Sequence, residues 1–300
     1  TMTTSLNETV GLIYLDSRRG AADLSSGNRE LLQSLAIEAS TILENARLLE
    51  QERARQALEE ELRIARLIQQ SLLPDRLPAS GWFRAAGSSI ASHQVGGDYF
   101  DAIQIGPDAW SAVVADVCGK GVSSALLAAL LQGAALRSAR APAEIEEMLA
   151  QLNRFLLERT QGEKYATLFY AVIRSDGELE WANAAHCAPL LVRRSGAVEP
   201  LEPTSLPVGL LESAAYEVKR ERLTPEDKLV IYTDGFTEAR NQQGQFFETA
   251  RLLRLVREHA RASCAALHAL LIEELHRFTG GAPQNDDVTL LVVEYRPDDI

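Results

Sequence analysis

Two different hydrophobic patterns meet at Pro74. Between residues 28 and 73, apolar residues recur at helical spacing among many glutamates and arginines. This pattern predicts one helix over 28–73 that Pro74 ends, about 70 Å long at about 1.5 Å per residue. Such a long helix is unusual in a globular domain, so its apolar seam predicts either a fold-back onto its own domain or a coiled-coil-like homodimer. We expect the homodimer, because the middle of the helix is rich in charge.

After Pro74, short apolar runs alternate with turn signals and with longer amphipathic stretches. Asp176-Gly177 is a hairpin signal between two of the runs. Strands that cluster apart from helices favour an α+β sandwich over a doubly wound parallel sheet. The predicted strands are 112–115, 167–173, 179–183, 229–232 and 289–293, and the predicted helices are 123–139, 142–159, 248–259 and 264–278.

The first residues resemble the end of a larger unit. Residues 11–15 read as a strand and residues 16–20 as a turn. One strand cannot bury its own face, so a partner sheet is expected, and it can lie upstream of this sequence.

Composition narrows the function classes. The 300 residues carry a formal net charge of -12, which disfavours binding to nucleic acid or to an anionic membrane. Cys118, Cys187 and Cys264 are far apart and suggest neither a zinc site nor a disulfide framework, so we expect reduced thiols in the cytoplasm. The uncharged stretch between Lys120 and Arg137 is short for a membrane span.

Aspartates stand beside glycines or at the ends of predicted strands. Asp98 follows two glycines, Asp116 and Asp234 each end a strand, and Asp286-Asp287 precede one. Any one of them could be an ordinary turn residue, but if they converge they would repel one another without a cation between them. Carboxylates without histidine or cysteine favour Mg²⁺ or Mn²⁺. Two such ions about 3.5–4 Å apart can activate a water against a phosphate ester.

Five segments of the chain, in order, closely resemble the bacterial SpoIIE/RsbU-type branch of the PPM phosphatases. They are residues 65–74, 95–101, 116–121, 232–239 and 286–289. The resemblance runs over about residues 65–295. It implies an αββα sandwich of two antiparallel sheets flanked by helices over 74–296, and two divalent cations, Mn²⁺ or Mg²⁺. It also implies hydrolysis of phosphoserine or phosphothreonine on a protein, with a STAS-domain (anti-anti-sigma) substrate suggested.

The resemblance also implies a ligand set. Asp98 and Asp116 would hold one cation together with the backbone carbonyl of Val117. Asp116 would bridge to a second cation held with Asp234 and Asp286. Asp287 is either a further ligand or a hydrogen-bond acceptor behind the ligands.

Further positions in these segments could contact substrate or support the ligands. Lys120 could meet phosphate or hold local structure, and His186 could orient substrate or water or be a core histidine. The chain departs from the family at Cys118, where serine is usual, and at Ala185, where glycine is usual, which puts the turn at Ala185 in doubt. The supporting candidates are Gly97, Gly119, Lys120, His186 and Gly235.

The segment before Pro74 resembles the last strand and helix of a GAF sensor domain, continued by a signalling helix. The likeness is carried by residues 31–49. It implies a GAF fragment over 1–27, a helical linker over 28–73, and regulation of the following domain by that linker.

The sequence gives weaker support to other functions. Cys187 and Arg193 have the bare spacing of a cysteine phosphatase but lack its glycine-rich phosphate loop, and Gly119-Lys120 lacks the rest of a P-loop. The serious alternative is a catalytically idle dimeric sensor or scaffold. The presence of every expected metal carboxylate favours the enzyme.

Overall fold

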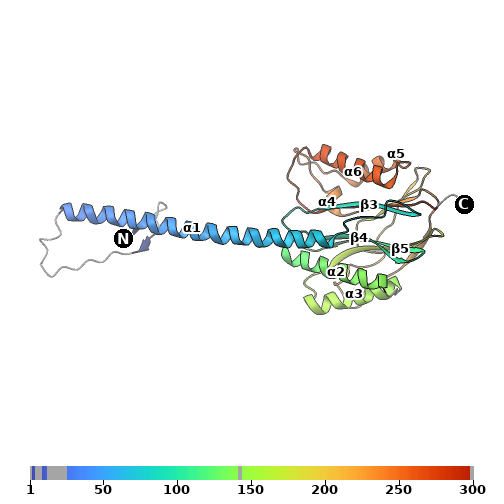
Figure 1. Ribbon diagram of the computed structural model, residues 1–300, viewed down its shortest axis with the longest axis horizontal. Helices are drawn as coiled ribbons and strands as arrows, with labels where there is room; N and C mark the ends of the chain where they lie inside the picture. The colour runs from blue at the N-terminus through green and yellow to red at the C-terminus, as the bar shows by residue number, and fades with distance from the viewer. Residues whose placement is uncertain (1, 4–8, 12–25, 141–143, 298–300) are drawn as a thin grey trace. The chain divides into compact units, whose positions relative to one another are not determined.

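The computed structural model describes residues 2–3, 9–11, 26–140 and 144–297 (Figure 1). The chain divides into two compact units, Thr1–Ile64 and Ala65–Ile300. In the first unit, β1 (Met2–Thr3) pairs antiparallel with β2 (Thr9–Gly11). The strand predicted at 11–15, apart from Gly11, and the turn predicted at 16–20 lie outside the described residues.

A single helix, α1 (Ser26–Leu72), confirms the long helix predicted before Pro74. The helix ends there because proline disfavours helical geometry in the residues just before it. Many large apolar side chains of α1 are exposed: Leu31, Leu35, Ile37, Ile42, Leu43, Leu48, Leu49, Leu58, Ile64, Leu67, Ile68 and Leu72. Across the described residues, the helices are too short or too polar to span a bilayer.

The second unit contains two five-stranded sheets whose neighbouring strands all run antiparallel, which confirms the predicted sandwich. Their orders are β10-β7-β6-β5-β4 and β3-β12-β11-β8-β9. The strands are β3 (Phe83–Ile90), β4 (Asp98–Gly106), β5 (Ala109–Val117), β6 (Ala166–Arg174), β7 (Glu178–Ala184), β8 (Leu190–Val192), β9 (Val198–Pro200), β10 (Lys219–Arg222), β11 (Lys228–Tyr232) and β12 (Val288–Tyr295).

Helices cover the outer faces of the two sheets (Figure 1). A core between the sheets is built from residues such as Phe100, Phe169 and Leu291. A second core lies between the first sheet and its helices, and a third lies between the second sheet and its helices. The helices are α2 (Val122–Arg140) and α3 (Ile145–Thr160) on the first sheet, and α4 (Asp234–Thr237), α5 (Thr249–Glu258) and α6 (Cys264–Thr279) on the second.

The antiparallel topology brings the predicted aspartates to one end of the sandwich. Asp98 begins β4 and stands directly opposite Asp116 near the end of β5. In the other sheet, Asp234 follows the end of β11, and Asp287 precedes the start of β12, its antiparallel neighbour. The site is therefore assembled from both sheets.

Candidate metal centre

Threonines from the second sheet fix Asp98, which belongs to the first. Its Oδ2 accepts a hydrogen bond of 2.9 Å from Thr233 Oγ1 and one of 2.6 Å from Thr289 Oγ1. The Asp98 carboxylate is buried. Beside it, a Cβ on Gly97 would lie 2.9 Å from the carbonyl oxygen of Val117, so only glycine lets the chain pass this close. The Val117 carbonyl thus lies at the same end of the sandwich as Asp98.

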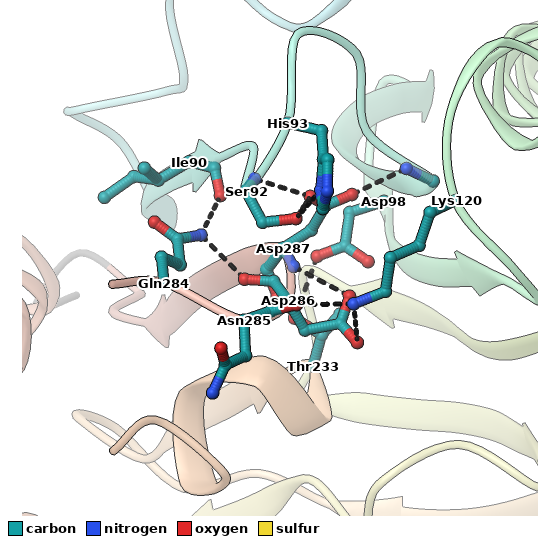
Figure 2. Close-up of polar contacts among 11 residues, drawn as sticks. Ile90, Ser92, His93, Asp98, Lys120, Thr233, Gln284, Asn285, Asp286 and Asp287 are labelled. Atoms are coloured by element: carbon teal, nitrogen blue, oxygen red, sulfur yellow. Dashed lines mark hydrogen bonds and ion pairs between the residues drawn. The ribbon is translucent and has the colours of Figure 1, made fainter. Parts of the chain in front are cut away.

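Asp287 is fully engaged in hydrogen bonds to the segment that leads into Asp98 (Figure 2). One carboxylate oxygen accepts from the backbone N–H of Ser92 at 2.7 Å and from its hydroxyl at 3.0 Å. The other accepts from the N–H of Gly97 at 2.6 Å. Only 7% of Asp287 is exposed. Of the two roles left open for Asp287, these contacts favour the acceptor behind the ligands.

Asp286 faces solvent instead. Its carboxylate lies 3.1 Å from Nζ of Lys120, and the two side chains are 49% and 47% exposed. Nζ also donates to the carbonyl of Asn285, while Gln284 Nε2 donates to the carbonyl of Asp286 at 2.7 Å (Figure 2). An exposed ion pair of this kind contributes about 0–1 kcal/mol, so Asp286 can leave Lys120 at little cost.

The clustered carboxylates raise one another's pKa values. Burial and then the charges of Asp234, Asp286 and Asp287 raise the pKa of Asp116 to about 7. Burial, followed by the charge of Asp116, raises the pKa of Asp98 well above its usual range. Burial and the charge of Asp286 also raise the pKa of Asp234. The negative charge of the carboxylates at this end of the sandwich therefore exceeds the positive charge of the side chains around them.

The residues fit divalent cations by chemistry, although the side chains are not gathered around a common point. Within residues 26–140 and 144–297, no three histidine, cysteine, aspartate or glutamate side chains form a group that could hold a metal ion as placed. The mutually repelling donors are all oxygen atoms, which suit Mg²⁺ or Mn²⁺. The half-exposed Asp286, now paired with Lys120, is the carboxylate freest to turn toward Asp116.

His186 lies behind the carboxylates and is buried. Its Nδ1 is 3.0 Å from the hydroxyl of Thr167, the residue opposite Asp116 in the β5–β6 pairing. Burial lowers its pKa to about 4, against a smaller opposing effect of the Tyr232 backbone, so the ring is neutral at pH 7. These contacts do not decide between the two predicted roles of His186, as a core residue or as a residue that orients substrate or water, so both stay predictions.

Glycines and one strained alanine shape the surrounding turns. Ala185, next to His186, has φ 56°, a left-handed conformation that glycine adopts more easily. Gly119 has φ 88°. A Cβ on Gly235 would lie only 2.0 Å from the carbonyl oxygen of Asp287, so a side chain there would force the two segments apart. The turn at Ala185, which the sequence left in doubt, therefore forms with alanine, but under strain.

Gln69 was not among the predicted site residues. Near the end of α1, its Oε1 accepts from the N–H of Gly96 at 3.0 Å and its Nε2 donates to the carbonyl of Gly96 at 2.6 Å. Both residues belong to the second unit. Gly96 precedes Gly97, whose N–H binds Asp287. The only sequence signal was the position of Gln69 within the 65–74 segment. We call this pair of hydrogen bonds the Gln69–Gly96 clasp.

Comparisons with known proteins identify the family of this chain. Residues 106–296 match the family described as stage II sporulation protein E (SpoIIE). Protein IcfG of a Synechocystis strain is 28% identical over 261 residues, which cover 78% of this chain and 41% of IcfG. Phosphoserine phosphatase RsbU of Bacillus subtilis is 26% identical over 240 residues, covering 79% of this chain and 71% of RsbU.

A solved structure is also similar. The crystal structure of the RsbU and RsbW domains of Rv1364c from Mycobacterium tuberculosis has a TM-score of 0.67 at 29% identity. The match covers 76% of this chain and 64% of that one. The chain thus spans well under half of IcfG and a little under two thirds of the Rv1364c structure.

Proposed function

Because the chain belongs to the SpoIIE family, we propose that it is a metal-dependent protein-serine/threonine phosphatase that acts on a regulatory phosphoprotein in bacterial signalling. The observation that carries the proposal is the placement of Asp98, Asp116 and Asp234 at one end of the sandwich, where the charge of Asp116 raises the pKa of Asp98 and the charge of Asp234 raises that of Asp116. RsbU and RsbP, which resemble this chain, are both named phosphoserine phosphatases.

Two Mn²⁺ or Mg²⁺ ions would be held by the donors described above. Asp98, Asp116 and the Val117 carbonyl would form one set, and Asp116, Asp234 and Asp286 the other. When bound, the cations supply the positive charge that activates water and neutralises the phosphate. Thr233 and Thr289 keep Asp98 aimed, since their hydroxyls hold one of its oxygens.

Lys120 adds a positive charge to the site. In its pairing with Asp286 it already lies at the solvent-facing side of the carboxylates, so an arriving phosphate can replace Asp286 as its partner. Its ammonium group donates hydrogen bonds and carries no acceptor, which suits a phosphate oxygen. We assign Lys120 to substrate binding on these grounds.

The substrate we propose is a phosphorylated STAS-type protein in the cytoplasm. The support is the similarity to RsbU and to a structure that contains an RsbU domain beside an RsbW domain. The acidic net charge of -12 supports a protein substrate over nucleic acid.

We further propose that α1 forms a homodimer and regulates the site, downstream of a GAF-like sensor that ends within residues 1–27. The row of exposed leucines and isoleucines on α1 would be buried by a second copy. The Gln69–Gly96 clasp gives α1 a direct contact with the segment before Asp98. A change in α1 can therefore reach a metal-ligand segment without passing through the sheets.

Hydrolysis of a phosphoserine peptide tests the function. We expect release of phosphate with Mn²⁺ or Mg²⁺, loss of activity with a chelator, and loss with Asp116→Asn. Activity that survives both chelation and the substitution would overturn the two-metal assignment. A chain that binds Mn²⁺ but hydrolyses no phosphorylated substrate would be the idle scaffold. Sedimentation at several concentrations tests the dimer, and a chain that stays monomeric throughout would exclude it.

A further inference from the structure

A pocket of about 280 Å³ opens directly beside the carboxylates and has no role in the chemistry proposed so far. Lys120, Gly235 and Asp286 form the wall that it shares with the candidate metal centre. Figure 2 shows part of this wall, with Ile90, Gln284 and Asn285 next to Asp286. A larger pocket of about 680 Å³, lined by residues such as Asp108 and Arg174, contains none of the five aspartates. The smaller of these two pockets is thus continuous with the reaction site.

The far wall of this pocket is a hairpin that presents an arginine and an aromatic ring. Arg240 and Phe246 face each other across an antiparallel bridge, and the guanidinium lies 4.5 Å from the ring centroid. Phe246 is 42% exposed, which is unusual for a phenylalanine. Among the described residues Arg240 makes no ion pair, so its charge is available to a ligand.

The hairpin is held rigidly. The N–H of Phe247 donates to the carbonyl of Ala239 at 2.9 Å, and the N–H of Asn241 donates to the carbonyl of Gln245 at 3.0 Å. Phe247 is buried, with its ring packed edge-on against Phe236 and Phe278. The backbone that carries Arg240 and Phe246 is therefore positioned before a ligand arrives, which reduces the entropy lost on binding.

Arg240 is the group in the pocket that favours an acidic ligand. The formal charges of the lining cancel, because Asp286 and Glu238 balance Lys120 and Arg240; Lys120 pairs with Asp286, whereas Arg240 makes no ion pair among the described residues, so the preference rests on Arg240. Arg240 supplies a permanent positive charge, and His276 lies on the same lining. An arginine resting on an aromatic ring keeps its N–H groups free at the edge for a carboxylate.

Resting on the proposed phosphatase function, we propose that Arg240 and Phe246 form a subsite that binds the stretch of the protein substrate next to the phosphorylated residue and selects an acidic side chain in it. The phosphate lies at the aspartates, and the neighbouring residues extend over the shared wall into the pocket. Arg240 pairs with the acidic side chain, while Phe246 packs against its aliphatic part.

The test compares phosphoserine peptides that differ only in carrying glutamate, leucine or lysine next to the phosphoserine. For the wild type we expect the glutamate peptide to have the lowest KM. Arg240→Ala should raise the KM for that peptide about fivefold with little change in kcat, since an exposed ion pair contributes up to about 1 kcal/mol. Arg240→Glu should reverse the preference in favour of the lysine peptide.

A matched control is Arg254→Ala, which removes an exposed arginine from α5 away from the pocket and should leave all three KM values unchanged. Thermal melting of each variant shows whether the hairpin still folds. An unchanged order of the three peptides in folded Arg240→Glu overturns the subsite. If the wild type hydrolyses neither these peptides nor p-nitrophenyl phosphate with Mn²⁺, the phosphatase function itself fails.

Discussion

The adjacent carboxylates Asp286 and Asp287 should respond in opposite ways to the same substitution. Asp287 accepts three hydrogen bonds, from two groups of Ser92 and from the N–H of Gly97. Asn in its place keeps one oxygen and turns an NH₂ group toward a backbone N–H. A buried donor left without an acceptor costs about 1–3 kcal/mol. We take about 2 kcal/mol, which lowers the melting temperature by about 4–8 °C in a domain of this size.

Asp286 makes fewer such contacts: its Oδ1 accepts one hydrogen bond of 2.9 Å from the N–H of Asp287, which the amide oxygen of asparagine can also accept. Its pairing with Lys120 is half exposed and contributes about 0–1 kcal/mol, so Asp286→Asn should lower the melting temperature by about 4 °C or less. Asp286 is a proposed ligand, however, so Asp286→Asn should lower the affinity for Mn²⁺ more than Asp287→Asn does. Asp287→Asn acts behind the ligands and should lower that affinity about tenfold.

The assay is thermal melting in a chelator together with calorimetric titration of Mn²⁺ into each variant. Melting in chelator isolates the hydrogen bonds from any stabilisation by metal. Equal melting temperatures for Asp287→Asn and the wild type would refute the structural role of Asp287. A smaller loss of Mn²⁺ affinity in Asp286→Asn than in Asp287→Asn would refute the ligand assignment.

Three further predictions follow from the site and its turns. Ala185→Gly should stabilise the fold by about 0.5–1 kcal/mol, because the strain of alanine at φ 56° exceeds the extra conformational entropy that glycine gives the unfolded chain. An unchanged or lower melting temperature would contradict this. Gln69→Ala should lower kcat/KM for a phosphopeptide several-fold with little loss of stability, and wild-type kinetics would show that the Gln69–Gly96 clasp is only structural. In chelator, the stability of the wild type relative to Asp116→Asn should fall as the pH rises from about 4 to about 7. In this range the folded state still holds a proton on Asp116 that the unfolded chain has already released. A stability difference that does not change with pH would exclude the raised pKa of Asp116.

Much of the fold could be predicted because the central strands are apolar and the long helix is periodic. The runs at 112–115, 229–232 and 289–293 lie within β5, β11 and β12, each buried on both faces between a sheet and a helix layer. By contrast, β10 reads Lys219-Arg220-Glu221-Arg222 and is exposed throughout. It is a strand because it pairs with β7 at a sheet edge, which no local hydrophobic pattern reports.

The candidate site was predicted as a set of aspartates, but their partners were not. Thr289 looks like an ordinary strand residue in sequence and Thr233 like the residue after a strand, and only the pairing of β11 with β12 brings both hydroxyls to Asp98. The choice between a ligand and a supporting acceptor at Asp287 likewise depends on Ser92, 195 residues away in the chain. Long-range contacts of this kind leave no local signature.

The Gln69–Gly96 clasp has a consequence for the concentration at which two chains associate. Thermodynamic linkage is reciprocal, so if pairing of α1 favours the arrangement of the segment before Asp98 that binds cations, then cations must favour pairing by the same factor. If association raises the Mn²⁺ affinity of a site tenfold, then filling that site lowers the dimer dissociation constant about tenfold, and each further linked site adds the same factor. Mn²⁺ or Mg²⁺ would then act on this protein as an assembly signal as well as a cofactor.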